Sequence, residues 1–134
     1  MPTRLSPPAL ALAGLVMAGL AGCATAPAKP VSPQDYASLQ TALRDSAEAR
    51  RNLQAYCTAA VAKKSADERE MIAAILDVDT ARVDRVFCER VIAGIAQKEL
   101  SYEDFVSISA RRTEPTTMRR FLRVLRRDPS EVMI

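Results

Sequence analysis

Seven arginines are concentrated near the end of the chain, and they are the residues best suited to bind an anion. Between Arg111 and Arg127 they are accompanied by one glutamate, Glu114, so this segment carries a formal charge of +6. A guanidinium group is planar and donates two parallel hydrogen bonds, which match phosphate and carboxylate groups. The alternative is an ordinary solvated helix face. The candidate anion-binding residues are Arg111, Arg112, Arg119, Arg120, Arg123, Arg126 and Arg127.

Catalytic and metal-binding patterns are missing from the sequence. The chain contains no His, and His is the side chain most often used as a general base and as a metal ligand. Neighbouring carboxylates occur at Asp67, Glu68 and Glu70 and again at Glu103 and Asp104. Helix capping explains these groups without a reaction. We therefore predict no enzyme, no cofactor and no metal, and a hydrolase is an alternative only if distant carboxylates converge in the fold.

The first 23 residues have the pattern of an export signal. One positive charge at Arg4 precedes an unbroken apolar run over residues 9–20, and small residues and a cysteine follow. The apolar run is shorter than the about 20 residues that cross a bilayer. The ending Leu20-Ala21-Gly22-Cys23 resembles the lipobox of bacterial lipoproteins.

This resemblance implies that the thiol of Cys23 is acylated, with palmitate as an expected acyl group, and that cleavage falls between Gly22 and Cys23. It also implies transport to the outer membrane, because Ala24 and not Asp follows the cysteine. The expected location is the face of that membrane toward the periplasm, and the residue after the cysteine does not determine this side. Three prolines in residues 24–33 favour an extended tether of up to about 30 Å. The alternatives are an ordinary signal peptide that happens to carry a cysteine, and a buried N-terminal helix.

Two cysteines, Cys57 and Cys88, are left once Cys23 is assigned to the lipid. Export places them in an oxidising compartment, where a pair of cysteines usually forms a bridge. We predict a Cys57–Cys88 disulfide, which closes a loop of about 32 residues and stabilises the fold by about 3–4 kcal/mol in the loop-entropy model. The alternative is two separately buried thiols.

The elements that carry these residues are predicted to be helices. Gly94 is the only glycine after residue 23, and residues with high helix propensity are abundant. Apolar residues at steps of three and four predict one long first helix from Ser32–Pro33 to about Lys63. Ser46 and Arg50 interrupt the apolar character of that stripe.

Four shorter helices are predicted to follow the first. Ser65 and Glu68 form a capping box, and Asp79 or Thr80 caps the next helix in preference to forming a calcium loop, which needs more ligands and a set glycine. Asp84 is interpreted as an acid of the first helical turn, with a buried pairing to an arginine such as Arg50 as the alternative. The predicted bounds are Ser65 to Leu76, Ala81 to Gln97, Ser101 to Ala110 and Pro115 to Arg127.

Together these patterns predict an all-α fold, a small bundle of about five helices with a long first helix. The predicted organisation is a signal peptide over 1–22, a lipidated linker over 23–33, a helical domain over 34–127 and a flexible tail over 128–134. The whole chain carries a formal charge of +3 and the signal segment contributes one arginine. The mature part is therefore +2, which gives no indication of nucleic-acid binding.

The predicted function is a membrane-anchored, non-catalytic interaction domain of the cell envelope. Its expected partners are the membrane through the lipid anchor, and anionic lipid, lipopolysaccharide or an envelope protein through the arginines. The alternative function is an accessory or inhibitory subunit of an envelope enzyme or a secretion complex.

Overall fold

The computed structural model describes residues 29–128, and this part of the chain contains six α-helices, one short 3₁₀ helix and no strand. The predicted all-α bundle is confirmed. No helix of the described part is long and apolar enough to cross a bilayer. The elements are α1 (Pro33–Asp45), α2 (Ala47–Ala62), α3 (Ala66–Leu76), η1 (Thr80–Arg82), α4 (Val83–Ala96), α5 (Tyr102–Ser109) and α6 (Pro115–Arg126).

The predicted signal peptide, residues 23–28 of the predicted linker with the cysteine predicted to be lipidated, and residues 129–134 of the predicted tail lie outside the described residues. The compact unit that holds the helices begins at Val31. The carbonyl of Val31 accepts a hydrogen bond of 2.9 Å from the hydroxyl of Tyr102. The end of the predicted tether is therefore attached to the helical unit by this contact.

Three helices begin at the predicted serines, through the same reciprocal pair of hydrogen bonds. Each serine hydroxyl accepts from the backbone N–H three residues later, at 3.0 to 3.2 Å. The carboxylate at that later position accepts in return from the N–H of the serine. Two donors at each helix start are thereby satisfied by local groups. The pairs are Ser32–Asp35, Ser65–Glu68 and Ser101–Asp104.

The predicted long first helix is wrong, because the chain breaks at Ser46 into α1 and α2. Ser46 has an extended backbone (φ −124°, ψ 115°), and its hydroxyl accepts a hydrogen bond from the N–H of Ala49 at 3.1 Å. The guanidinium of Arg50 reaches back to the carbonyls of Leu43 and Arg44, at 2.7 and 3.0 Å. The two residues that interrupt the apolar stripe thus end one helix and begin the next.

The entry into α4 also differs from the prediction. Asp79 directly precedes η1 and Arg82 directly precedes α4, and neither side chain caps the helix that follows it. The N–H of Arg82 donates to the carbonyl of Asp79 at 2.9 Å. The predicted capping by Asp79 or Thr80 is therefore wrong, because a 3₁₀ turn makes this connection. Asp84 does lie in the first turn of α4, and it pairs with Arg69 at 3.0 Å and not with Arg50.

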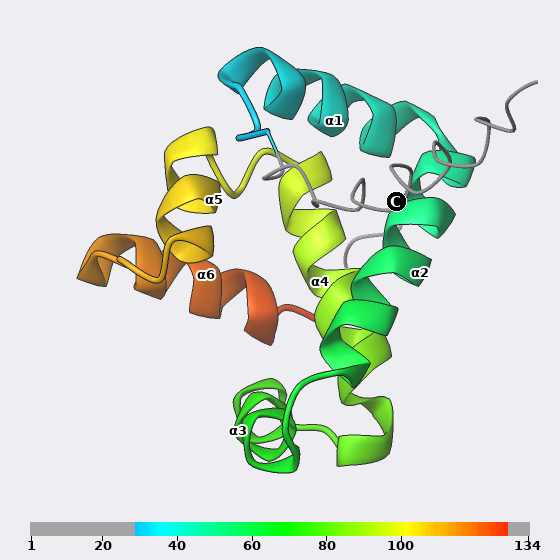
Figure 1. The fold of residues 1–134 in the computed structure, drawn as a ribbon, viewed down its shortest axis with the longest axis vertical. Helices are drawn as coiled ribbons and strands as arrows, with labels where there is room; N and C mark the ends of the chain where they lie inside the picture. Colours follow the sequence, from blue (N-terminus) through cyan, green and yellow to red (C-terminus); the bar gives the residue numbers. More distant parts are fainter. Residues whose placement is uncertain (1–28, 129–134) are drawn as a thin grey trace, which may run out of the picture. The chain divides into compact units, whose positions relative to one another are not determined.

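Helix α4 lies at the centre of the bundle, and α1, α2, α3 and α6 all pack against it (Figure 1). The Cys57–Cys88 disulfide joins α2 to α4, with the two Cα atoms 5.8 Å apart. The predicted pairing is confirmed. Cys88 is fully buried, so the bridge lies against the core and fixes the packing of α2 on the central helix.

Helix α6 is anchored in both apolar clusters of the core by two consecutive residues. Val124 packs in the cluster with Tyr36, Leu43 and Ile92, and Leu125 packs in the cluster with α3 and the start of α4. A close approach at Gly94 allows this docking, because a Cβ atom there would lie 2.5 Å from Cγ1 of Val124. The orientation of α6, and of its arginines, is therefore set by the core.

Candidate functional site

The outer face of α6 carries a row of three arginines. Arg119, Arg123 and Arg126 follow one another at steps of four and three residues, and all three are exposed. None of their side chains makes a hydrogen bond or an ion pair within the described part of the chain. At 3.6 residues per turn they lie opposite the buried stripe of the helix. This stripe consists of Thr117, Phe121, Val124 and Leu125, which are buried or half-buried.

Arg120 in α6 and Arg127 directly after its end lie on one flank of the helix and are paired with acids. Arg120 contacts Asp104 at 3.2 Å, and Arg127 contacts Glu99 and donates to Gln97 at 2.8 Å. Asp104 lies in α5, and Gln97 and Glu99 lie in the loop before it. The predicted face of seven arginines is thus divided between residues that hold α6 in place and residues that are free for a partner.

The opposite flank of α6 exposes apolar side chains. Met118 is 40% exposed, and Leu122 is half-buried. Leu122 and the arginine row border a shallow depression of about 510 Å³. The surface of α6 therefore combines a positive row with an apolar margin.

The last two candidate arginines, Arg111 and Arg112, lie in the turn between α5 and α6. Both are exposed, and Arg111 has a left-handed backbone (φ 55°). The turn is closed by the hydroxyl of Ser107, which donates to the carbonyl of Arg112 at 2.8 Å. Hydrogen bonds from Ser65 lower the pKa of the Glu68 carboxyl in α3, and the charge of Arg111 lowers that pKa slightly further. These two arginines extend the positive surface beyond the start of α6.

Asp104 is the buried residue that positions this surface. Its side chain is 2% exposed, accepts from the N–H of Ser101 at 3.0 Å at the start of α5, accepts from the hydroxyl of Thr117 at 2.9 Å and pairs with Arg120. Burial alone would raise the pKa of Asp104, but hydrogen bonds from Ser101 and Thr117 and the charge of Arg120 outweigh it and hold the pKa below 3.8. The carboxylate thus stays charged and ties α6 to α5.

Other arginines in the described part of the chain bind the carbonyls that helix ends leave free. Arg50 does so at the end of α1. Arg90 donates to the carbonyl of Leu76 at 3.1 Å and to that of Leu125, at the ends of α3 and α6. A cation at a helix C-terminus also interacts favourably with the helix dipole. Much of the arginine content of this chain is therefore structural.

A second arginine-rich region was missed by the sequence analysis. A hollow of about 1110 Å³ lies between α2, α4 and the ends of α1 and α6. No local signal in the sequence indicates it, because its residues come from four separate helices and meet only in the fold. The arginines that line it are Arg44, Arg50, Arg51, Arg85, Arg90 and Arg127.

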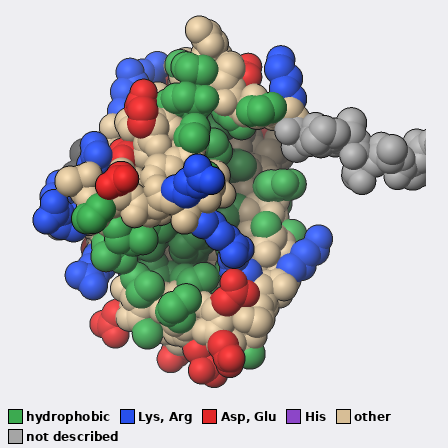
Figure 2. All heavy atoms as spheres, turned by 60° about the vertical axis from the view of Figure 1, so that its left-hand side comes forward, with side chains coloured by type: hydrophobic (Ala, Val, Ile, Leu, Met, Phe, Trp, Pro, Cys, Tyr) green, Lys and Arg blue, Asp and Glu red, His purple; other side chains and the backbone are tan. Residues whose placement is uncertain are grey.

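Acidic side chains gather at the lower end of the face seen in Figure 2, where α3 is located. Lys and Arg side chains lie over the middle and the upper part of this face, where a few Asp and Glu side chains lie among them. Of the neighbouring carboxylates noted in the sequence, Glu68 and Asp104 serve as helix caps. Within the described residues, no group of three or more His, Cys, Asp or Glu side chains is placed to hold a metal ion.

Comparison with models of known protein families, with characterised proteins and with solved structures gave no match to this chain.

Proposed function

We propose that this chain is a lipid-anchored protein of the bacterial envelope whose helical domain binds an anionic membrane surface through α6. The single observation that carries the proposal is the row of Arg119, Arg123 and Arg126, exposed and without an acidic partner among the described residues. The anchor rests on the lipobox-like segment ending at Cys23, and it would hold this row near lipid headgroups.

The contribution of the arginine row to membrane binding can be estimated from its charge. A basic residue near an anionic bilayer surface contributes about 1 kcal/mol of binding free energy. Three such residues therefore contribute about 3 kcal/mol, or roughly a hundredfold in affinity. The interaction is between exposed charges, so it weakens as salt shortens the screening length.

The apolar margin of α6 supports the same orientation on a membrane. The apolar face of α6 is packed in the core, so Met118 and Leu122, which lie beside the arginine row, are the apolar side chains of α6 that would reach the headgroups. Exposed apolar area inserted between headgroups adds a contribution that salt does not screen. Binding should therefore fall with salt without vanishing.

The test is cosedimentation of the full chain, carrying Cys23→Ser to remove the proposed acylation, with vesicles of phosphatidylglycerol and phosphatidylcholine. We expect binding to the anionic vesicles, and at least about a hundredfold weaker binding for Arg119→Glu/Arg123→Glu/Arg126→Glu. Arg120 is left unchanged because it pairs with the buried Asp104. Substituting it would disturb the fold as well as the surface.

The matched control is Lys63→Glu/Lys98→Glu/Arg82→Glu, which changes the charge by the same amount at exposed positions outside α6. It should retain most of the binding. An equal loss in both variants would show a response to net charge only, and no loss in the α6 variant would refute the proposed surface.

The anchor is tested separately, by intact mass spectrometry of the unaltered chain purified from a bacterial envelope. The proposal requires a mature chain that begins at Cys23 and carries acyl mass. A chain without acyl mass would refute the anchor while leaving the vesicle result for α6 intact.

A protein-docking role, as an accessory or inhibitory subunit in the envelope, is the second candidate function. It is favoured by α3, where Met71 is 60% exposed beside the exposed acids Asp67 and Glu70. An apolar docking surface resists salt, whereas charge-led binding to a bilayer weakens. Crosslinking in the envelope at low and high salt therefore separates the two functions.

A further inference from the structure

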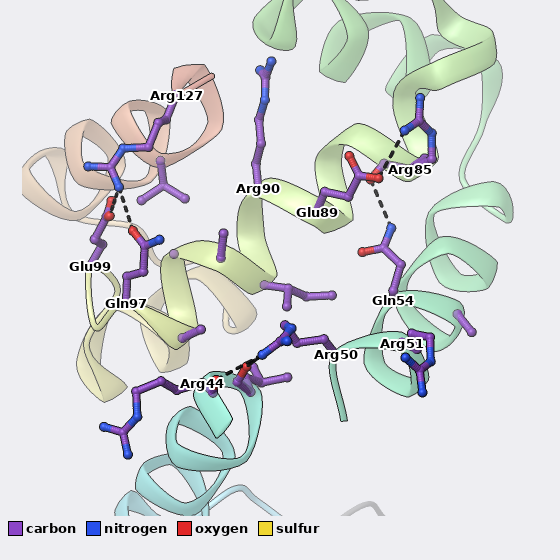
Figure 3. Close-up of a pocket in the computed structure, with 17 residues that line it drawn as sticks. Arg44, Arg50, Arg51, Gln54, Arg85, Glu89, Arg90, Gln97, Glu99 and Arg127 are labelled. Atoms are coloured by element: carbon purple, nitrogen blue, oxygen red, sulfur yellow. Dashed lines mark hydrogen bonds and ion pairs between the residues drawn. The ribbon is translucent and has the colours of Figure 1, made fainter. Parts of the chain in front are cut away.

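The hollow between α2 and α4 has the size of a ligand pocket. Its volume of about 1110 Å³ lies just above the range of about 300–1,000 Å³ that is common for small-molecule sites. Figure 3 shows Arg127, Glu99 and Gln97 on one side of this hollow and Arg50, Arg51 and Gln54 on the opposite side.

The floor of the hollow is apolar and its rim is positive. The floor is formed by Leu43, Ile92, Ala93, Ala96 and Val124, and six arginines but only two glutamates, Glu89 and Glu99, line the hollow. An apolar body with an anionic end is therefore the ligand chemistry that suits both parts. A cationic or wholly polar ligand would leave the guanidinium groups or the apolar floor unmatched.

One arginine of the rim is free to receive the anion. Arg44 and Arg85 pair with acids next to them in their helices, Arg127 pairs with Glu99, and the two others, Arg50 and Arg90, bind helix-end carbonyls. Among the described residues, Arg51 is the one arginine of the six whose side chain makes no hydrogen bond or ion pair, and it is exposed. A single free guanidinium matches a single carboxylate, to which it donates two parallel bonds.

The length of the hollow matches one acyl chain. Helix α4 lines it from Arg85 to Ala96, which at 1.5 Å per residue is about 16 Å. Two opposed acyl chains make up the about 30 Å of a bilayer core, so one chain extends about 15 Å. We propose that this hollow binds a fatty acid, with the acyl chain along Ala93 and Ala96 and the carboxylate on Arg51.

The test is calorimetric titration of dodecanoate into the full chain carrying Cys23→Ser, below the micelle concentration. We expect one bound dodecanoate per chain. Dodecyltrimethylammonium, which has the same chain and a cationic head, should bind at least about tenfold more weakly, because the charge-assisted bonds are lost. Dodecyl phosphate should bind no more tightly than dodecanoate, because Arg51 is the one exposed arginine of the hollow whose side chain has no partner among the described residues.

Two variants test the two parts of the proposed site. Arg51→Glu should weaken dodecanoate binding by at least about tenfold, and as an exposed substitution it should leave the fold intact. Ala93→Trp fills the hollow and should abolish binding, with Ala59→Trp, at an exposed position of α2 outside the hollow, as its control. Since the chain contains no Trp, the introduced indole also reports on whether the variant is folded.

The proposal is overturned if Arg51→Glu binds dodecanoate as the parent does, if the cationic amphiphile binds equally well, or if dodecyl phosphate binds more than about tenfold tighter. It is independent of the membrane-binding proposal, because Arg119→Glu/Arg123→Glu/Arg126→Glu should leave dodecanoate binding unchanged. If one of the two proposals fails its test, the other is therefore still decided by its own measurement.

Discussion

The substitution Gly94→Ala tests whether the close approach of α4 and α6 holds the bundle together. The added Cβ would lie 2.5 Å from Cγ1 and 3.2 Å from Cγ2 of Val124. Val124 is 4% exposed, and a β-branched side chain in a helix has essentially one χ1 rotamer. The contact is therefore relieved only by moving α6 away from α4.

Two opposing contributions set the change in the free energy of unfolding that Gly94→Ala causes. Overpacking a buried contact costs about 1–3 kcal/mol, whereas replacing glycine by alanine within a helix stabilises it by about 0.8–1.0 kcal/mol. We expect Gly94→Ala to lower the free energy of unfolding by about 1 kcal/mol, which lowers Tm by about 4–8 °C for a domain of this size. Val124→Ala removes the obstructing methyl groups, so in that background Gly94→Ala should instead raise stability by about 1 kcal/mol.

The assay is urea unfolding followed by far-ultraviolet circular dichroism for the parent, the two single variants and the double variant. The double-mutant cycle isolates the contact, and we expect a coupling free energy of about 1–3 kcal/mol. If Gly94→Ala changes stability by the same amount in both backgrounds, the residues do not contact each other. The reasoning about how α6 docks on α4 would then be refuted.

Two further variants test the buried carboxylate and the disulfide. Because the folded-state pKa of Asp104 lies below 3.8, its carboxylate stabilises the fold above that pH, and the contribution is lost as pH falls toward the folded-state pKa. Asp104→Asn should therefore lower stability at pH 7 by about 1–3 kcal/mol and reduce the loss of stability, read from the urea midpoint, as pH falls below the usual pKa of an aspartate. Reducing the bridge between Cys57 and Cys88 should lower the free energy of unfolding by about 3–4 kcal/mol. Urea midpoints with and without reductant measure this, with Cys57→Ser/Cys88→Ser as a control that should not respond to reductant.

Helix starts could be predicted from the sequence because they depend on neighbours. At Ser32, Ser65 and Ser101 the serine and the acid three residues later satisfy each other, with no help from distant parts of the chain. The disulfide was predictable for another reason: once Cys23 was assigned to the lipid, only one pair was left.

The break between α1 and α2 could not be predicted from periodicity. The apolar stripe continues on both sides of Ser46, and a serine or an arginine within a helix is ordinary. What decides the break is a set of contacts, among them Arg50 on the carbonyls of Leu43 and Arg44. These contacts exist only after the chain has turned.

By itself, the sequence determined the helical class, the positions of three helix starts, the cysteine pair and the positive charge of α6. The tertiary structure decided which arginines are free. Arg120 and Arg127 are held by Asp104 and Glu99, whereas Arg119, Arg123 and Arg126 face outward. The reason is that capping and helical periodicity act over three or four residues. The partner of a long side chain is instead set by helices that pack together from distant parts of the chain.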